Sequence, residues 1–192
     1  MKRAMRILFA LALAALGSAC HESGFIRVQL TDAPLEAVAA KQVLVTIGEV
    51  RVHDDADKST PTNGNPAAGA DKDGADGQGW IVLCNKTQTF DLMQLRNGAK
   101  ADFCAGQATE LVAGKISQMR LGVIAATLIL QDGSTHELTV PSGPQSGLKI
   151  NIDQTVSAKQ TLMLVIDFDA DKSIVAEGNG SYKLKPVLRL AQ

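Results

Sequence analysis

Three aspartates stand at alternate positions near the C-terminal end, Asp167, Asp169 and Asp171. Hard cations such as calcium take several oxygen ligands, and clustered carboxylates supply them. A further aspartate, Asp32, adds a ligand if its corner of the fold lies nearby. The sequence therefore offers a calcium site built from these four carboxylates. The alternative is that Asp169 or Asp171 accepts backbone N–H groups in a turn.

Trp80 is the only tryptophan in the chain, and it follows a long polar segment. Proteins that bind sugars stack them on exposed aromatic rings, so Trp80 is a candidate ligand-binding residue. Together with the aspartates, it would make a calcium-dependent carbohydrate-binding module. The alternative places Trp80 in the core, at the start of a strand.

Familiar catalytic motifs are missing from the sequence. It contains neither G-x-S-x-G nor H-E-x-x-H, and its three histidines, His21, His53 and His136, lack the spacing of a zinc site. No basic patch with interleaved aromatic residues indicates nucleic-acid binding. We therefore expect no enzymatic activity, no nucleic-acid partner and no cofactor other than calcium. An enzyme with an unrecognised pair of carboxylates is the alternative.

Residues 1–19 have the pattern of a secretory signal peptide. Three basic residues precede the apolar run 7–16, which is too short for a membrane span of roughly 20 residues. Small residues follow and lead directly into Cys20. This arrangement resembles the bacterial lipobox, whose cysteine is lipidated, although Gly17 stands where the lipobox usually has leucine. We therefore expect a lipid on Cys20, and ordinary cleavage with a free thiol is the alternative.

A lipid on the cysteine would make residues 20–23 a membrane tether. His21 is not the aspartate that favours retention at the inner membrane, so we expect an exported protein at the outer membrane or facing the periplasm. Export implies an oxidising compartment, where the remaining pair, Cys84 and Cys104, is more often a disulfide than a metal site. Two free buried thiols are the alternative.

Apolar residues recur at every second position in several segments, which is the pattern of strands with one buried face. Phe25–Thr31, Val43–His53 and Thr161–Phe168 show this pattern clearly. The second of them changes phase at Gly48, where we expect a β-bulge. Roughly nine such segments with short connections predict an all-β fold. We expect residues 24–192 to form a single antiparallel β-sandwich with Greek-key connections, immunoglobulin-like or transthyretin-like.

The segment 54–79 interrupts this pattern. Alanine is its only apolar residue type, so it cannot bury enough surface to offset the entropy of ordering the chain. We therefore expect one long, flexible acidic insertion that is disordered or loosely held.

A series of short motifs occurs in one order along the chain: Leu30–Pro34, Val52-His53, Gly79-Trp80, Pro141-Ser142, Gly147–Lys149, Asp167–Ala170, Lys172–Val175 and Leu184–Val187. In this order they resemble the secreted bacterial lipoproteins catalogued as domain of unknown function 4382. The resemblance covers about residues 24–190. It implies an exported, often lipid-anchored β-domain with no established activity.

These features favour a non-enzymatic, lipid-anchored domain of the cell envelope with a binding or scaffolding role. Its partners would be the membrane, through the lipid, and a carbohydrate or another envelope protein. A calcium-dependent carbohydrate-binding module is the alternative function.

Overall fold

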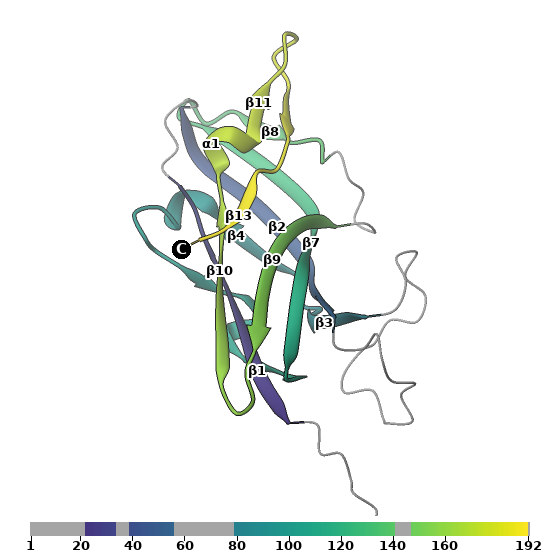
Figure 1. The fold of residues 1–192 in the computed structure, drawn as a ribbon. Helices are drawn as coiled ribbons and strands as arrows, with labels where there is room; N and C mark the ends of the chain where they lie inside the picture. The colour runs from purple at the N-terminus through teal and green to yellow at the C-terminus, as the bar shows by residue number, and fades with distance from the viewer. Residues whose placement is uncertain (1–21, 34–38, 56–78, 141–146, 192) are drawn as a thin grey trace, which may run out of the picture.

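The computed structural model describes residues 22–33, 39–55, 79–140 and 147–191. These residues form an all-β sandwich of two packed sheets (Figure 1). The elements in chain order are β1 (Ser23–Thr31), β2 (Ala40–Asp54), β3 (Trp80–Cys84), β4 (Gln88–Asp91), the 3-10 helix η2 (Leu92–Gln94), β5 (Ala101–Asp102), the 3-10 helix η3 (Phe103–Gly106), β6 (Thr109–Val112), β7 (Gly114–Leu130), β8 (Thr135–Glu137), β9 (Leu148–Val156), β10 (Thr161–Phe168), α1 (Ala170–Ser173), β11 (Ile174–Ala176), β12 (Tyr182–Leu184) and β13 (Leu188–Leu190).

The first sheet is built around β1 and β10, which pair in parallel from Phe25 opposite Thr161 to Thr31 opposite Asp167. β13 pairs with the other side of β10, and β5 and β6 pair with the other side of β1, all of them antiparallel. A parallel pair needs a long connection, and here most of the chain supplies it. Every other pair of strands in the two sheets described is antiparallel, and an isolated parallel bridge joins Thr139 to Lys183 outside them.

The second sheet is built around the long strands β2 and β7, which pair antiparallel. β3 and β4 pair with the other side of β2, and β8 and β9 pair with the other side of β7. The register between β2 and β7 passes from Ile47 opposite Val123 to Glu49 opposite Gly122. Gly48 is thus the extra residue of a bulge, which confirms the prediction from the change of phase. The bulge lets both halves of β2 direct their apolar residues into the core.

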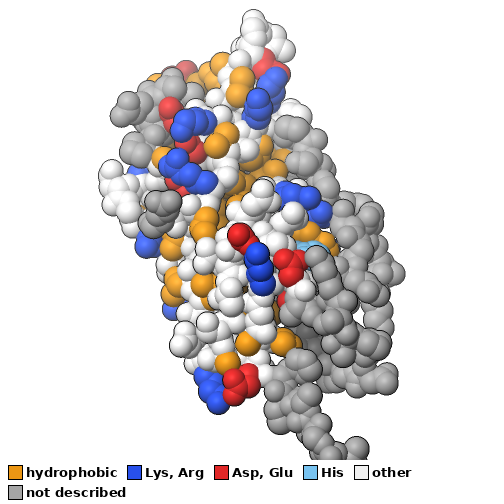
Figure 2. Space-filling model, in the orientation of Figure 1, with side chains coloured by type: hydrophobic (Ala, Val, Ile, Leu, Met, Phe, Trp, Pro, Cys, Tyr) orange, Lys and Arg blue, Asp and Glu red, His pale blue; other side chains and the backbone are white. Residues whose placement is uncertain are grey.

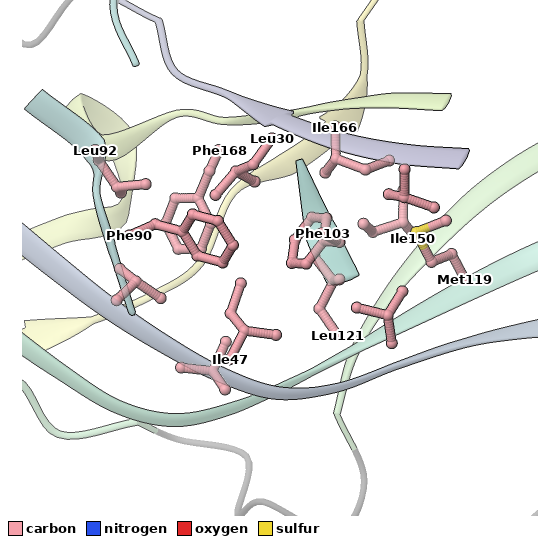
Figure 3. Close-up of a cluster of buried hydrophobic side chains, with 14 of the residues drawn as sticks. Leu30, Ile47, Phe90, Leu92, Phe103, Met119, Leu121, Ile150, Ile166 and Phe168 are labelled. Atoms are coloured by element: carbon pink, nitrogen blue, oxygen red, sulfur yellow. The ribbon is translucent and has the colours of Figure 1, made fainter. Parts of the chain in front are cut away.

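Alternate residues of both sheets fill the space between them (Figure 3). The largest fully buried side chains are Phe168, Ile26, Leu30, Ile47, Leu92, Ile116, Met119, Leu121, Leu128, Leu164, Ile166 and Leu184. Those of β1 and β10 belong to the apolar phase of their strands, as the alternation of the sequence predicts. β7 changes phase instead, because Ile116 and Met119 are both buried and its register with β9 shifts between Ile116 and Gln118.

The sandwich has two different ends. β1 begins at Ser23 at one end, which we call the tether end. Because β10 runs parallel to β1, both strands finish at the opposite end, which carries α1 and the hairpin β11–β12 and which we call the hairpin end (Figure 1). At the tether end, the turn after β9 packs on β1. The backbone of Gly24 approaches Ser157 so closely that a β-carbon would collide with the Ser157 carbonyl.

The ends of the predicted insertion 54–79 lie next to each other. Asp54 is the last residue of β2 and is buried, and its N–H donates to the carbonyl of Gly79 at 2.7 Å. The rest of the insertion, residues 56–78, lies outside the described residues, as do the predicted signal peptide and Cys20. In the part of the chain that the structure describes, no helix has the length and apolar character of a membrane span.

Candidate functional site

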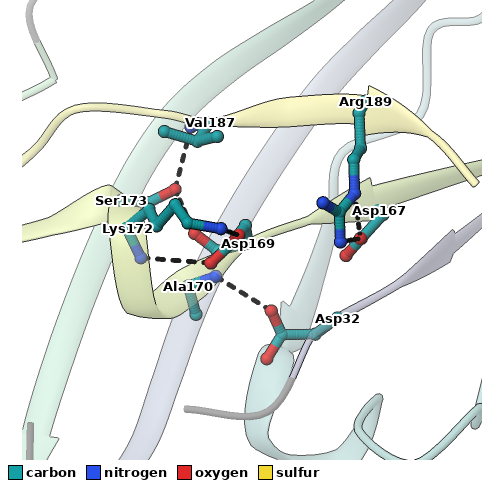
Figure 4. Close-up of polar contacts among 8 residues, drawn as sticks. All are labelled: Asp32, Asp167, Asp169, Ala170, Lys172, Ser173, Val187 and Arg189. Atoms are coloured by element: carbon teal, nitrogen blue, oxygen red, sulfur yellow. Dashed lines mark hydrogen bonds and ion pairs between the residues drawn. The ribbon is translucent and has the colours of Figure 1, made fainter. Parts of the chain in front are cut away.

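The parallel pairing of β1 and β10 brings together aspartates that are far apart in the sequence. Asp167 lies opposite Thr31 in the register, so Asp32 lies beside the C-terminal end of β10. Asp32, Asp167 and Asp169 are buried, with exposed fractions of 4%, 6% and 2%. We call these three residues the acidic corner (Figure 4). Asp171, the fourth predicted ligand, lies in the first turn of α1.

Asp32 positions α1 through one carboxylate oxygen. Its Oδ1 accepts a hydrogen bond of 2.9 Å from the N–H of Ala170 (Figure 4), whereas Oδ2 is buried with no hydrogen-bond partner among the described residues. Burial is the largest cause that raises the pKa of Asp32 to about 7, and the charges of Asp167 and Asp169 add to it. The Ala170 bond and the charge of Arg96 act in the opposite direction. Asp32 therefore exchanges its proton near neutral pH.

Asp169 caps α1. Its carboxylate accepts the backbone N–H of Lys172 at 3.1 Å and the Lys172 ammonium at 2.6 Å. Burial alone would raise the pKa of Asp169, but these hydrogen bonds and the charges of Lys172 and Arg189 hold the pKa below its usual value. Ser173 completes the turn, because its hydroxyl donates to the Asp169 carbonyl and accepts from the N–H of Val187. This is the turn role that the sequence offered as the alternative to metal binding.

Only one of the two carboxylate oxygens of Asp167 has a partner among the described residues. The Nε of Arg189, on β13, donates to Asp167 Oδ2 at 2.7 Å, while Asp167 Oδ1 is buried with no partner among the described residues. The acidic corner therefore holds two unsatisfied carboxylate oxygens, Oδ2 of Asp32 and Oδ1 of Asp167. An unsatisfied buried polar group costs about 1–3 kcal/mol, so a proton, a water molecule or a cation at either oxygen would stabilise the fold.

The corner is not a ready-made metal cage. Within the described ranges, no group of three or more His, Cys, Asp and Glu side chains is arranged to hold a metal ion. The described structure places Asp32, Asp167 and Asp169 in one corner, but the Asp169 carboxylate is occupied by Lys172, and Asp171, the fourth predicted ligand, lies on α1. A cation bound there would take further ligands from water or from backbone carbonyls.

The basic residues of this corner were missed by the sequence reasoning. Arg189 stands between two leucines on the outward phase of its strand, but its contact with Asp167 depends on the pairing of β13 with β10. Lys172 did carry a signal, because it follows Asp169 by three residues, the spacing at which side chains meet on a helical turn.

The acidic corner falls within a segment that matches a known family. The family model described as domain of unknown function (DUF4382) matches residues 23–186. The chain belongs to this family. The match starts at the first residue of β1 and covers all three residues of the acidic corner, but it ends before β13 and Arg189. No curated protein and no solved structure matches the chain significantly.

In this DUF4382 domain, Trp80 packs into the second sheet. Its exposed fraction is 8%. The guanidinium of Arg120 lies over the indole at 4.3 Å from the ring centroid, and the ring of His53 meets it edge-on with 5.1 Å between centroids. With one face covered by Arg120, the indole is not an open platform for a sugar. Trp80 is paired with His53 and shares its outward phase, and it is not among the side chains of the core cluster. It therefore lies on the outer face of the second sheet, at the start of a strand but not in the core between the sheets.

Cys84 and Cys104 form a disulfide, as predicted. Their Cα atoms are 5.9 Å apart, which is within the usual range for a disulfide. Cys84 ends β3 of the second sheet, whereas Cys104 lies in η3, between the two strands β5 and β6 that flank β1 in the first sheet. The disulfide therefore ties the two layers of the sandwich together.

Proposed function

We propose that the chain is a non-enzymatic domain of the cell envelope that is exported, anchored by a lipid on Cys20, and binds or scaffolds a partner with its hairpin end. The partner is a carbohydrate or another envelope protein, and the protein is held at the outer membrane or faces the periplasm. The observation that carries this proposal is the difference between the two ends. β1 begins three residues after Cys20, whereas the hairpin and the acidic corner lie at the opposite end (Figure 1).

The hairpin β11–β12 has the properties of a presented binding element. In the pair of strand residues next to its loop, the ring of Tyr182 packs edge-on against His136 with 4.8 Å between centroids. Near its tip, the hydroxyl of Ser181 donates to the carboxylate of Glu177, and Lys183 forms an ion pair with the same carboxylate. A polar loop that is ordered before binding loses little conformational entropy when a partner binds.

Replacing Cys20 tests the anchor. The Cys20→Ser variant is expected to leave the membrane fraction for the soluble fraction, because the thiol that would carry the lipid is gone. Intact-mass measurement of the wild type is expected to give the mass of residues 20–192 plus a diacylglyceryl group. A Cys84→Ala, Cys104→Ala double variant, which retains Cys20, should stay in the membrane fraction.

Two results would overturn this proposal. A wild-type protein with a free thiol on Cys20 in the soluble fraction would remove the anchor. Turnover of a glycan or peptide substrate that is lost in an Asp169→Ala variant of normal stability would replace the binding role with an enzymatic one.

A calcium-dependent carbohydrate-binding module is the second candidate, and the unsatisfied oxygens of Asp32 and Asp167 favour its calcium component. Both oxygens are buried without a partner among the described residues, and carboxylate oxygens are preferred calcium ligands. The sugar component has less support, because Arg120 covers one face of Trp80.

Under this second candidate, calcium is expected to raise the temperature of unfolding relative to EDTA. A ligand that binds only the folded state stabilises it by about 2.7 kcal/mol at a hundredfold excess over its Kd. The Asp32→Asn variant should lose this shift, while Glu110→Gln, which changes an exposed acid on β6, should keep it. Equal unfolding temperatures in calcium and EDTA would leave the corner with its structural role alone.

A further inference from the structure

Large apolar side chains are exposed on the first sheet. Among the described residues, the exposed fractions are 38% for Phe25, 41% for Val112 and 46% for Met163. The other large exposed apolar side chain, that of Ile124 at 49%, belongs to β7 in the second sheet. An apolar residue exposed alone needs no explanation, but a group on one face indicates a contact surface.

The three residues share the outer face of the first sheet. Val112 is paired with Ser23, and Met163 is paired with Arg27. Phe25 lies between Ser23 and Arg27 along β1, two residues from each, so all three have the same phase. Phe25 is therefore the diagonal neighbour of both Val112 and Met163. We call these three residues the apolar patch.

The apolar patch lies at the tether end of the sandwich. Phe25 is the third residue of β1 and follows Cys20 by only five positions. An extended chain spans at most about 3.3–3.6 Å per residue, so the three steps from Cys20 to Ser23 reach roughly 10 Å. A lipid on Cys20 would hold this end of the first sheet within that distance of the bilayer surface.

The surroundings of the patch suit the interface of a bilayer. In Figure 2, hydrophobic side chains reach the surface at the lower, tether end of the molecule, beside a basic and an acidic side chain in contact. Lys159, in the turn before β10, pairs with Glu22 at 3.2 Å and has a side chain that is 82% exposed. A long, exposed lysine beside apolar side chains can place its ammonium among lipid headgroups while its stem lies on apolar surface.

We propose that the apolar patch rests on the membrane in which the Cys20 lipid is inserted, so that the domain is held in one orientation with its hairpin end away from the bilayer. This inference rests on the proposed lipid anchor and adds a second contact to it. The lipid anchor and a short apolar surface reinforce each other, because the tether keeps the patch at a high effective concentration near the membrane.

A fluorescent label at position 163 tests this orientation. The lipidated full-length protein would be reconstituted into vesicles of phosphatidylethanolamine and phosphatidylglycerol, with Met163→Cys carrying an environment-sensitive dye. Ile124→Cys is the matched control, because Ile124 is equally exposed but lies on the other sheet. The dye reacts only with the introduced thiol, since Cys84 and Cys104 are bonded to each other and the lipid blocks Cys20.

The dye at position 163 is expected to shift to shorter emission wavelength on reconstitution and to lose several-fold more intensity than the dye at position 124 when nitroxide-labelled lipids are included. Equal quenching at the two positions, in vesicles that carry the lipidated protein, would refute the contact between the apolar patch and the membrane. The proposed lipid anchor would be unaffected by that result. A shift at position 163 that depends on protein concentration, without quenching, would assign the patch to a second copy of the chain and overturn the inference. If the intact mass showed no lipid on Cys20, both the proposed anchor and this inference would be refuted.

Discussion

Asp32→Asn is expected to make the domain more stable than the wild type at about pH 8, by on the order of 4 kcal/mol in the free energy of unfolding. Burial and the neighbouring carboxylates raise the pKa of Asp32 from 3.8 to about 7 in the folded state. Asparagine keeps an oxygen in the position of Oδ1 for the Ala170 amide, but it has no charge to bury. Denaturant unfolding of both proteins across the pH range measures the difference.

The direction in which the free energy of unfolding changes with pH follows from proton binding to Asp32. Between about pH 4 and pH 7, the folded state keeps the Asp32 proton while the unfolded state has lost it, so raising the pH lowers the stability of the wild type. The stabilising effect of protonation is complete below the unfolded pKa of 3.8 and is lost as the pH passes the folded pKa of about 7. The advantage of Asp32→Asn should therefore shrink towards zero near pH 4.

An opposite control is available in the same domain. The hydroxyl and backbone N–H of Ser134 hold the pKa of Asp132 below its usual value, so its ionised form favours folding. Asp132→Asn should lose stability at neutral pH and match the wild type more closely in acid. The free energy of unfolding of Asp32→Asn should exceed that of the wild type by an amount that changes with pH. If this difference were the same at every pH, the assignment of a raised pKa to Asp32 would be refuted.

Reduction of the Cys84–Cys104 disulfide is expected to lower the free energy of unfolding by about 3 kcal/mol, since the bond closes a loop of roughly 20 residues in the unfolded chain. For a domain of this size, that loss corresponds to a fall of roughly 6–12 °C in the midpoint of thermal unfolding. The two sheets would keep their shared core but lose the covalent bond between them. Thermal unfolding with and without dithiothreitol measures the effect.

The Cys84→Ala, Cys104→Ala double variant separates this effect from other actions of the reductant. It should unfold near the temperature of the reduced wild type, and dithiothreitol should not change that temperature. If reduced and oxidised wild-type protein unfolded at the same temperature, the disulfide would have no part in the stability of the sandwich.

Local patterns in the sequence predicted the strands, the bulge and the disulfide. The change of phase around Gly48 located the bulge because one extra residue moves every later side chain of a strand to the other face. The pairing of Cys84 with Cys104 followed from having two cysteines in a chain that the sequence predicts to be exported. These predictions needed no knowledge of which strands are neighbours.

The candidate site depends on knowledge of that kind. Asp32 and Asp167 are brought together by the pairing of β1 with β10, and Arg189 reaches Asp167 through the pairing of β13 with β10. Alternation shows which face a residue occupies but not which strand lies beside it. The sequence therefore offered the four aspartates as one candidate group, with a turn role for Asp169 or Asp171 as the alternative, while the unsatisfied oxygens and the raised pKa of Asp32 required the three-dimensional contacts.

The parallel pair at the centre of the first sheet also constrains how the domain assembles during synthesis. Phe25 is paired with Thr161, so β1 cannot complete its sheet until the more than 100 residues between the two strands and β10 itself have been made. Contacts of such high sequence separation slow folding, and an unpaired apolar strand is a template for aggregation while it waits. The first sheet is therefore completed late, because β1 stays without its parallel partner until β10 is available to pair with it.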